Sequence, residues 1–188
     1  GGTVAFRRFQ AGMTLDLHSR MAVVSPKAAT FPQTETLLVV KREGEHKKPE
    51  IVETLPQGKS VVIGCRPCGA RGKLIFTPVY ETDKIKDPYF IARRDNTVFI
   101  TLACDRPETT CFCHSVGSGP ADTAGSDILL TLVGEGYVAK SVTAQGEEIL
   151  KMALFEDAGA KVKEAEVKNA KALELMGATH DYESAPAK

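Results

Sequence analysis

Two short apolar runs are the clearest structural signal along this chain. Residues 60–64 and 97–103 are almost continuously apolar and lack the alternation of a half-exposed strand. Continuous apolar runs of this length are typical of strands that a sheet buries on both faces. We therefore expect two buried central strands at these positions.

The chain before residue 95 carries further signals. Residues 36–40 form a β-rich run that predicts a strand, and the charged residues 41–50 predict a solvated hairpin or loop. Asp87-Pro88, followed by residues 89–94, is typical of a helix that begins with proline in its first turn.

The second half of the chain adds a hairpin and helical sequence. Two apolar runs at 127–132 and 137–142 flank Val-Gly-Glu-Gly, which favours a β-hairpin. The Gly- and Pro-rich residues 115–126 predict a loop. Residues 145–176, rich in Ala, Glu, Lys and Leu, predict helix with a break near Gly159.

This alternation of strands and helices predicts an α/β fold with an irregular mixed sheet, strand-end loops that carry cysteines, and a C-terminal helical segment. We expect residues 1–150 to form one α/β cluster-binding domain. Residues 151–188 would then be a helical C-terminal extension or linker.

Composition and charge narrow the possible partners and the compartment. The 188 residues are 43% hydrophobic and hold 24 basic and 24 acidic side chains, so net charge favours neither nucleic acid nor an anionic membrane. No apolar run approaches the ~20 residues that span a bilayer, and we find no signal peptide. An odd count of five cysteines suits a reducing cytoplasm better than a disulfide framework.

The five cysteines fall into two groups, Cys65 with Cys68, and Cys104 with Cys111 and Cys113. Each group begins directly after one of the two predicted central strands. In open α/β sheets the carboxyl ends of the strands are where ligands bind. The sequence therefore predicts a binding site for an inorganic cofactor at this edge.

Thiolates select zinc, copper(I) or iron–sulfur clusters. The Cys-x6-Cys-x-Cys spacing of the second group does not match the paired knuckles of structural zinc. A cubane cluster is larger than one ion and accepts uneven spacing more readily. Arg66, Arg71 and Arg106 flank the cysteines and suit an anionic centre. Spacing thus favours an iron–sulfur cluster, while zinc and redox-active thiols remain open.

Other candidate residues are weaker. We expect His114 to be a solvent-facing loop histidine rather than a ligand, and residues 117–120 to be a loop that wraps the site. Neither a GxGxxG nor a GxxxxGK[ST] motif occurs, so nucleotide binding is not expected. Caps and turns account for four acidic residues near the cysteines. These are Asp105, Glu108, Asp122 and Asp127.

An ordered set of motifs carries a resemblance to a known family. The motifs are Ser25-Pro26-Lys27, Phe31-Pro32-Gln33-Thr34-Glu35, Gly64-Cys65-Arg66-Pro67-Cys68, Asp87-Pro88-Tyr89-Phe90, Arg93-Arg94-Asp95-Asn96-Thr97, Cys104, Thr110-Cys111-Phe112-Cys113, Gly119-Pro120 and Gly125-Ser126-Asp127. In this order, over roughly residues 20 to 150, the chain resembles the N-terminal part of the sulfhydrogenase beta-subunit family, also called 4Fe-4S dicluster domain proteins.

The resemblance implies a cytoplasmic electron-transfer subunit of a hydrogenase or heterodisulfide-reductase-like complex. Such a subunit relays electrons between a flavin and NAD(P)-binding subunit and a catalytic subunit, and does no bond chemistry itself. The family's C-terminal ferredoxin domain, with two further clusters, is expected to be missing, since no cysteine follows Cys113.

The family pattern has no cysteine at position 65. The expected ligands of one [4Fe-4S] cluster are therefore Cys68, Cys104, Cys111 and Cys113. Cys65 is a spare thiol or a substitute for Cys68. Two alternatives remain: a zinc-stabilised interaction module, and a thiol-redox protein that uses Cys65 and Cys68 as a CxxC pair.

Overall fold

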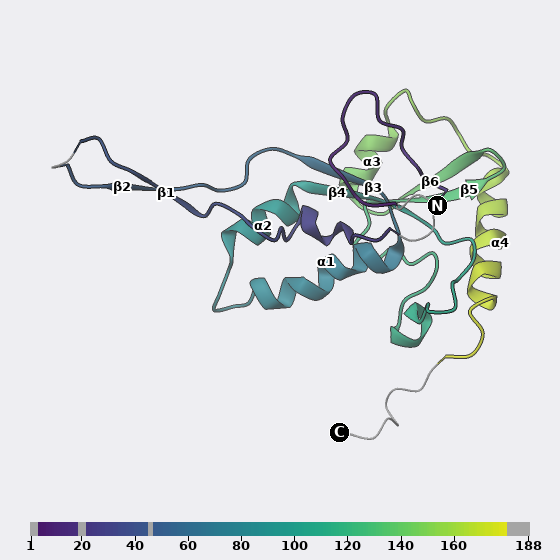
Figure 1. The fold of residues 1–188 in the computed structure, drawn as a ribbon. Coiled ribbons are helices and arrows are strands. Elements are labelled where there is room, and N and C mark those ends of the chain that lie inside the picture. Colours follow the sequence, from purple (N-terminus) through teal and green to yellow (C-terminus); the bar gives the residue numbers. More distant parts are fainter. Residues whose placement is uncertain (1–3, 19–21, 45–46, 180–188) are drawn as a thin grey trace, which may run out of the picture.

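The computed structural model describes residues 4–18, 22–44 and 47–179 (Figure 1). It contains a four-stranded sheet in the order β3-β4-β5-β6 and a separate two-stranded sheet, β1-β2. The strands are β1 (Leu38–Lys41), β2 (Glu50–Glu53), β3 (Ser60–Cys65), β4 (Thr97–Leu102), β5 (Ile128–Val133) and β6 (Gly136–Ser141). The helices are α1 (Pro67–Tyr80), α2 (Pro88–Asp95), α3 (Ala144–Leu150) and α4 (Lys161–Glu174), with short 3-10 turns η1 (Pro26–Ala29) and η2 (Cys113–Val116).

Both predicted strands are present as β3 and β4, which pair in parallel. Only β4 is a buried central strand; the expectation is wrong for β3, which is the edge strand of the sheet and is exposed at half of its positions. Strand β4 also pairs in parallel with β5, and β5 pairs with β6 as the predicted antiparallel hairpin. The sheet is therefore mixed, and the predicted α/β class is confirmed. Strand β4 is buried at nearly every position, as its continuous apolar sequence requires.

Helix α1 was not expected from the sequence. Gly69, Gly72 and Pro78 all lower its intrinsic propensity, and no side chain caps its N-terminus. Aromatic packing supplies the missing stability, because Tyr80 stacks on Phe90 of α2 with ring centroids 4.7 Å apart. Tertiary contacts thus override a weak local preference.

Helix α2 begins where its sequence predicts. The Asp87 carboxylate accepts hydrogen bonds from the backbone N–H groups of Tyr89, at 2.9 Å, and Phe90, at 3.0 Å. Pro88 occupies the first helical position, where a missing N–H costs nothing.

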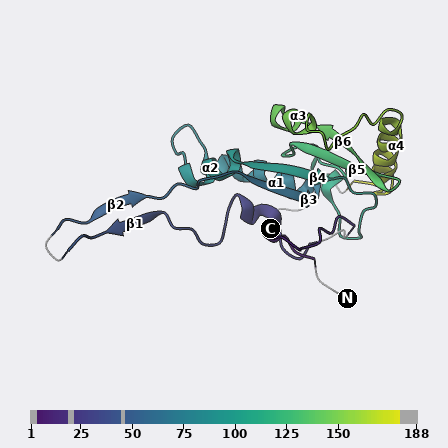
Figure 2. The ribbon, with the colours of Figure 1, turned by 90° about the horizontal axis from the view of Figure 1, so that it is seen from above.

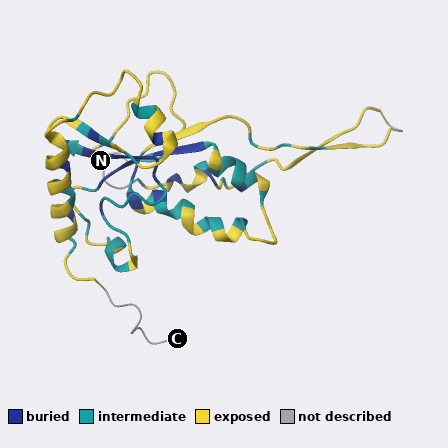
Figure 3. Ribbon diagram, turned by 180° about the vertical axis from the view of Figure 1, so that it is seen from behind, coloured by how far each residue is buried: buried dark blue, intermediate teal, exposed yellow. Residues whose placement is uncertain are grey.

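Helices lie on both sides of the four-stranded sheet, and its inner strands β4 and β5 are the most buried (Figure 3). Helix α1 lies on one side, α3 on the other, and α4 stands at the end of the sheet (Figure 1). Ala165 of α4 packs against Val133 and Val138. The predicted helical break is confirmed between α3 and α4, where Gly159 adopts a φ of +50°. Within the described residues, no helix has the length and apolarity to cross a membrane.

Strands β1 and β2 form a ribbon that projects away from the sheet (Figure 2). The expectation of a hairpin over residues 41–50 is confirmed, since β1 and β2 flank this charged segment. An ion pair between Glu35 and Arg93 of α2 fixes the base of the ribbon. The Tyr89 hydroxyl strengthens this anchor by donating to the carbonyl oxygen of Leu37.

Candidate functional site

The parallel pairing of β3 and β4 brings both cysteine groups to one edge of the sheet. Strand β3 ends at Cys65, and β4 ends two residues before Cys104. The Arg66 guanidinium joins the two strand ends by donating to the carbonyl oxygens of Leu102, at 3.5 Å, and Ala103, at 3.1 Å. Cys68 follows in the first turn of α1 and is exposed.

The loop after β4 holds the other three cysteines, Cys104, Cys111 and Cys113, and all three are half-buried. The backbone N–H of Cys104 donates to the carbonyl oxygen of Pro120 at 2.8 Å, which fixes both ends of this loop. The N–H of Glu108 donates to the sulfur of Cys111 at 3.3 Å. Cys113 is the first residue of η2.

Arg71 of α1 fastens this loop to the helix that carries Cys68. Its guanidinium donates to the carbonyl oxygens of Val116 and Gly117 and pairs with the Asp122 carboxylate at 3.1 Å. Burial on its own would raise the pKa of Asp122, but hydrogen bonds from Ser118, the Ala124 N–H and Arg71 together hold this pKa below its ordinary value.

The electrostatic surroundings of Cys104 include three other thiols. Burial raises the pKa of Cys104 to about 11, and the Arg66 charge opposes this shift, while Cys68, Cys111 and Cys113 add to it. Burial likewise raises the pKa of Cys113, and the nearby Cys111 and Cys68 raise this pKa further. We call Cys68, Cys104, Cys111 and Cys113 the four-thiol set.

Cys65 differs from the four-thiol set because it belongs to a hydrophobic core cluster. A bulge at Gly64, with a φ of +81°, shifts the register of β3 and turns Cys65 toward the same side as Val62. There Cys65 packs fully buried with Val62 and Phe99. Burial, reinforced by the nearby Cys68, raises the pKa of the Cys65 thiol to about 12.

All five cysteines are free thiols. In the described parts of the chain, no group of three or more His, Cys, Asp or Glu side chains is arranged to hold a single metal ion. The donor set is nevertheless soft, and its members reach one edge from two separate loops. Thiolate donors of this kind are ligands of zinc, copper(I) and iron–sulfur centres.

The expectation that His114 faces solvent is wrong. Its ring is half-buried, with Nε2 at 3.0 Å from the carbonyl oxygen of Ala178. Its Nδ1 is buried and has no hydrogen-bond partner among the residues that the structure describes.

Asp122 and Asp127 have structural roles, but only the Asp122 contact with Ala124 is of the predicted turn type. Asp122 binds Arg71 and accepts from the Ala124 N–H. Asp127 accepts from the Phe99 N–H at 2.8 Å and from the Thr143 hydroxyl at 2.7 Å.

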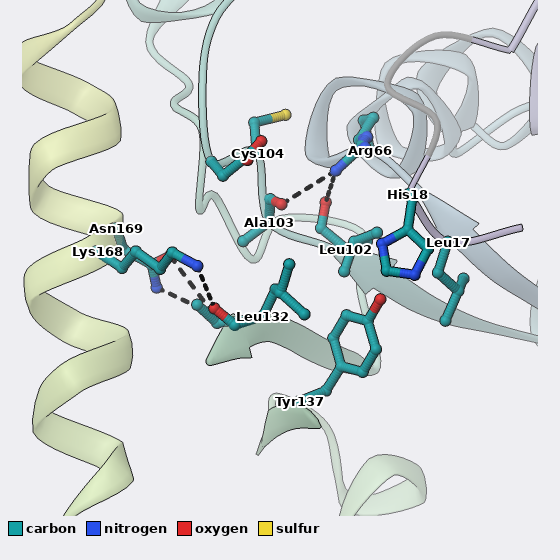
Figure 4. A pocket seen from close by; sticks show the side chains of 12 residues that line it. Leu17, His18, Arg66, Leu102, Ala103, Cys104, Leu132, Tyr137, Lys168 and Asn169 are labelled. Atoms are coloured by element: carbon teal, nitrogen blue, oxygen red, sulfur yellow. Dashed lines mark hydrogen bonds between the residues drawn. The ribbon is translucent and has the colours of Figure 1, made fainter. Parts of the chain in front are cut away.

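A small polar pocket of about 100 Å³ adjoins Cys104 (Figure 4). Arg66, Tyr137 and Lys168 line it, and the Lys168 ammonium donates to the carbonyl oxygen of Leu132 at 2.8 Å. No local pattern in the sequence indicates this pocket, because Tyr137 and Lys168 come from β6 and α4 and belong to no motif. The pocket places fixed positive charge on one side of Cys104.

Comparisons with known proteins give one informative match. No family model matches the chain, and no solved structure matches it. The chain is 31% identical over 130 residues to sulfhydrogenase 2 subunit beta of Pyrococcus furiosus, which covers 68% of this chain but 37% of that protein. It thus spans well under two thirds of the length of this relative. The resemblance expected from the ordered motifs is confirmed: the chain is a homologue of a sulfhydrogenase beta subunit over part of that protein's length.

Proposed function

We propose that this chain is an electron-transfer subunit of a cytoplasmic hydrogenase-type oxidoreductase complex, with one [4Fe-4S] cluster bound by the four-thiol set. The observation that carries the proposal is that the parallel strands β3 and β4 end at the same sheet edge, where both cysteine groups follow them. Similarity to a subunit named for a sulfhydrogenase supports the redox class.

The bound cluster would supply a one-electron carrier. The protein's own groups would bind it and tune it. The Glu108 N–H already donates to the Cys111 sulfur, and such bonds stabilise a thiolate. The Arg66 charge lowers the pKa of Cys104 against the effect of burial, so it favours the ligating form of that thiol.

The surface near the four-thiol set suits contact with partner subunits. Cys68 is exposed, and Phe112, which separates Cys111 from Cys113, is 54% exposed. An apolar side chain presented beside a redox centre favours docking of another protein there. We propose that the partners are a flavin and NAD(P)-binding subunit and a catalytic subunit of hydrogenase or heterodisulfide-reductase type. The chain itself would break no substrate bond.

Iron and acid-labile sulfide, measured after anaerobic purification, test the cluster. We expect about four of each per chain, with broad absorbance in the visible range that dithionite bleaches. Replacing Cys111 or Cys113 by Ser should remove most of the iron and the colour. Cys65→Ser is the matched control and should retain both, because Cys65 packs in the core.

The same measurements separate the alternatives. A colourless protein with stoichiometric zinc would rule out the cluster and favour the zinc-stabilised interaction module. A metal-free protein with disulfide reductase activity would favour a Cys65–Cys68 redox pair. That hypothesis is weakened by the burial of Cys65 and by its high pKa, since attacking thiols are exposed and readily ionised.

A further inference from the structure

The β1–β2 ribbon has one apolar face that no other part of the described chain covers. Residues directly opposite each other in an antiparallel pair share a face. The pairs Leu38↔Glu53 and Val40↔Ile51 therefore lie on one side of the ribbon, and Val39↔Val52 and Lys41↔Glu50 on the other. We call the side with Leu38, Val40 and Ile51 the ribbon's apolar face.

The apolar face is strongly exposed. Leu38, Val40 and Ile51 are 56%, 64% and 65% exposed, whereas Val39 on the opposite side is 37% exposed. Figure 2 shows the ribbon extending away from the sheet and its helices. An isolated two-stranded ribbon is marginally stable in water, so a contiguous apolar face of this kind indicates a contact surface.

The apolar face has an acidic residue at one end and a basic residue at the other. Glu53 lies at the base of the ribbon, opposite Leu38. If the alternation continues one residue past the paired strands, Arg42 lies on the same face, opposite Pro49, at the outer end of the strands. Both charged residues are exposed, and each has an apolar residue across the ribbon. On the other face, by contrast, Lys41 and Glu50 oppose each other and balance locally.

This order is self-complementary. Glu53 and Arg42 each lie two positions from the central Val40↔Ile51 pair, in opposite directions. A two-fold axis that crosses the strands at this pair would lay the apolar faces of two ribbons together, antiparallel. The Glu53 carboxylate of each copy would then lie diagonally across from the Arg42 guanidinium of the other. An isologous interface requires this kind of self-matching pattern.

We propose that the occupant of the apolar face is a second copy of this chain, bound ribbon to ribbon in an antiparallel two-fold dimer. The inference is independent of the proposed function, because neither the ribbon nor its contacts include a residue of the four-thiol set. A stable interface buries roughly 800 Å² on each partner, and three exposed side chains supply only a few hundred Å². The dimer is therefore reversible and dissociates on dilution.

Sedimentation of the full chain from low micromolar to near-millimolar concentration tests the proposal. We expect a monomer–dimer equilibrium that high salt weakens, since the Glu53–Arg42 contacts are exposed. Glu53→Arg and Arg42→Glu should each raise the dissociation constant at least about tenfold, because each reversal puts like charges together twice. The double variant should return it to within about threefold of wild type.

Two further variants complete the test. Ile51→Lys should abolish dimerisation, because it places a charge at the centre of the apolar face. The matched control is the exchange Lys41→Glu with Glu50→Lys, which alters charge on the opposite face and should leave the dissociation constant unchanged. A chain that stays monomeric throughout, a double charge reversal that does not rescue, or a control that weakens the dimer equally would each overturn the proposal.

Discussion

The sulfur of Cys113 lies 3.6 Å from the sulfur of Met176. Sixty-three residues separate the two in sequence, so the segment that follows helix α4 contacts the loop that carries three cysteines. The contact between His114 and the carbonyl oxygen of Ala178 lies beside it. The residues directly after helix α4 thus contribute to the surroundings of the four-thiol set.

Met176→Ala should uncover Cys113 in the metal-free protein. The thioether is a flexible apolar cover, and its removal opens a path for reagents to a half-buried sulfur. We expect alkylation of Cys113 to be at least about threefold faster in the native state, in keeping with a local rather than global opening. Peptide mapping after timed alkylation measures this rate.

Met176→Leu is the control for this change, because it keeps the apolar volume. Its alkylation rate at Cys113 should match wild type. Equal rates in wild type and Met176→Ala would show that α4 does not shield this thiol.

Arg71→Gln should loosen the loop between β4 and β5. The side chain holds two loop carbonyls and the Asp122 carboxylate from a position on α1. Losing these charge-assisted bonds should lower the free energy of unfolding by about 1–3 kcal/mol. Urea denaturation of the metal-free protein measures the loss, and proteolysis within residues 105–118 should accelerate.

The pH dependence of this variant gives a second readout. Asp122 has a lowered folded-state pKa, so its contribution to stability is present above its ordinary pKa and is lost as pH falls through the folded value. Arg71→Gln should reduce this acid-side loss. Arg71→Lys keeps the charge but not the fork of donors, so its acid-side loss of stability should lie between those of wild type and Arg71→Gln. If stability falls at acid pH as much in Arg71→Gln as in wild type, the assigned role of the Arg71–Asp122 ion pair is wrong.

Strong, local sequence patterns predicted much of the fold. The apolar runs of β3 and β4, the Asp87 cap of α2 and the β5–β6 hairpin each carry their own signal within a few residues. Convergence of the two cysteine groups followed from parallel pairing of neighbouring strands, and this too was predictable.

Features that depend on distant contacts were not predictable. Helix α1 needs aromatic partners from Phe31 and Phe90 to offset its Gly and Pro residues. The orientation of Cys65 depends on one bulge at Gly64, because a shift of one residue reverses which side chains face the core. His114 is half-buried because the chain after α4 returns to it.

Gly125→Ala should be strongly destabilising. Its φ of +82° disfavours any side chain, and an added Cβ would lie 2.2 Å from the carbonyl oxygen of Ala70 in α1. Because the colliding atom is backbone, either the loop or α1 must move. We expect a loss of about 3 kcal/mol or more in the free energy of unfolding, measured by chemical denaturation. Gly134→Ala also has a positive φ but an open site, so it should lose only about 1 kcal/mol from strain.

Stability of the metal-free protein should fall with rising pH because of Cys65. Its folded-state pKa of about 12 lies above the ordinary value of 9.0, so the unfolded chain loses this proton first as pH rises. The contribution is therefore full below pH 9 and is lost between pH 9 and 12, at up to about 1.4 kcal/mol per pH unit. Urea denaturation between pH 8 and about 10.5 should show Cys65→Ala with a shallower fall than wild type. Cys68→Ala, which removes an exposed thiol, should keep most of the wild-type slope. If Cys65→Ala and wild type fall in parallel, the Cys65 thiol ionises as readily in the folded chain as in the unfolded one, and its assignment to the core is wrong.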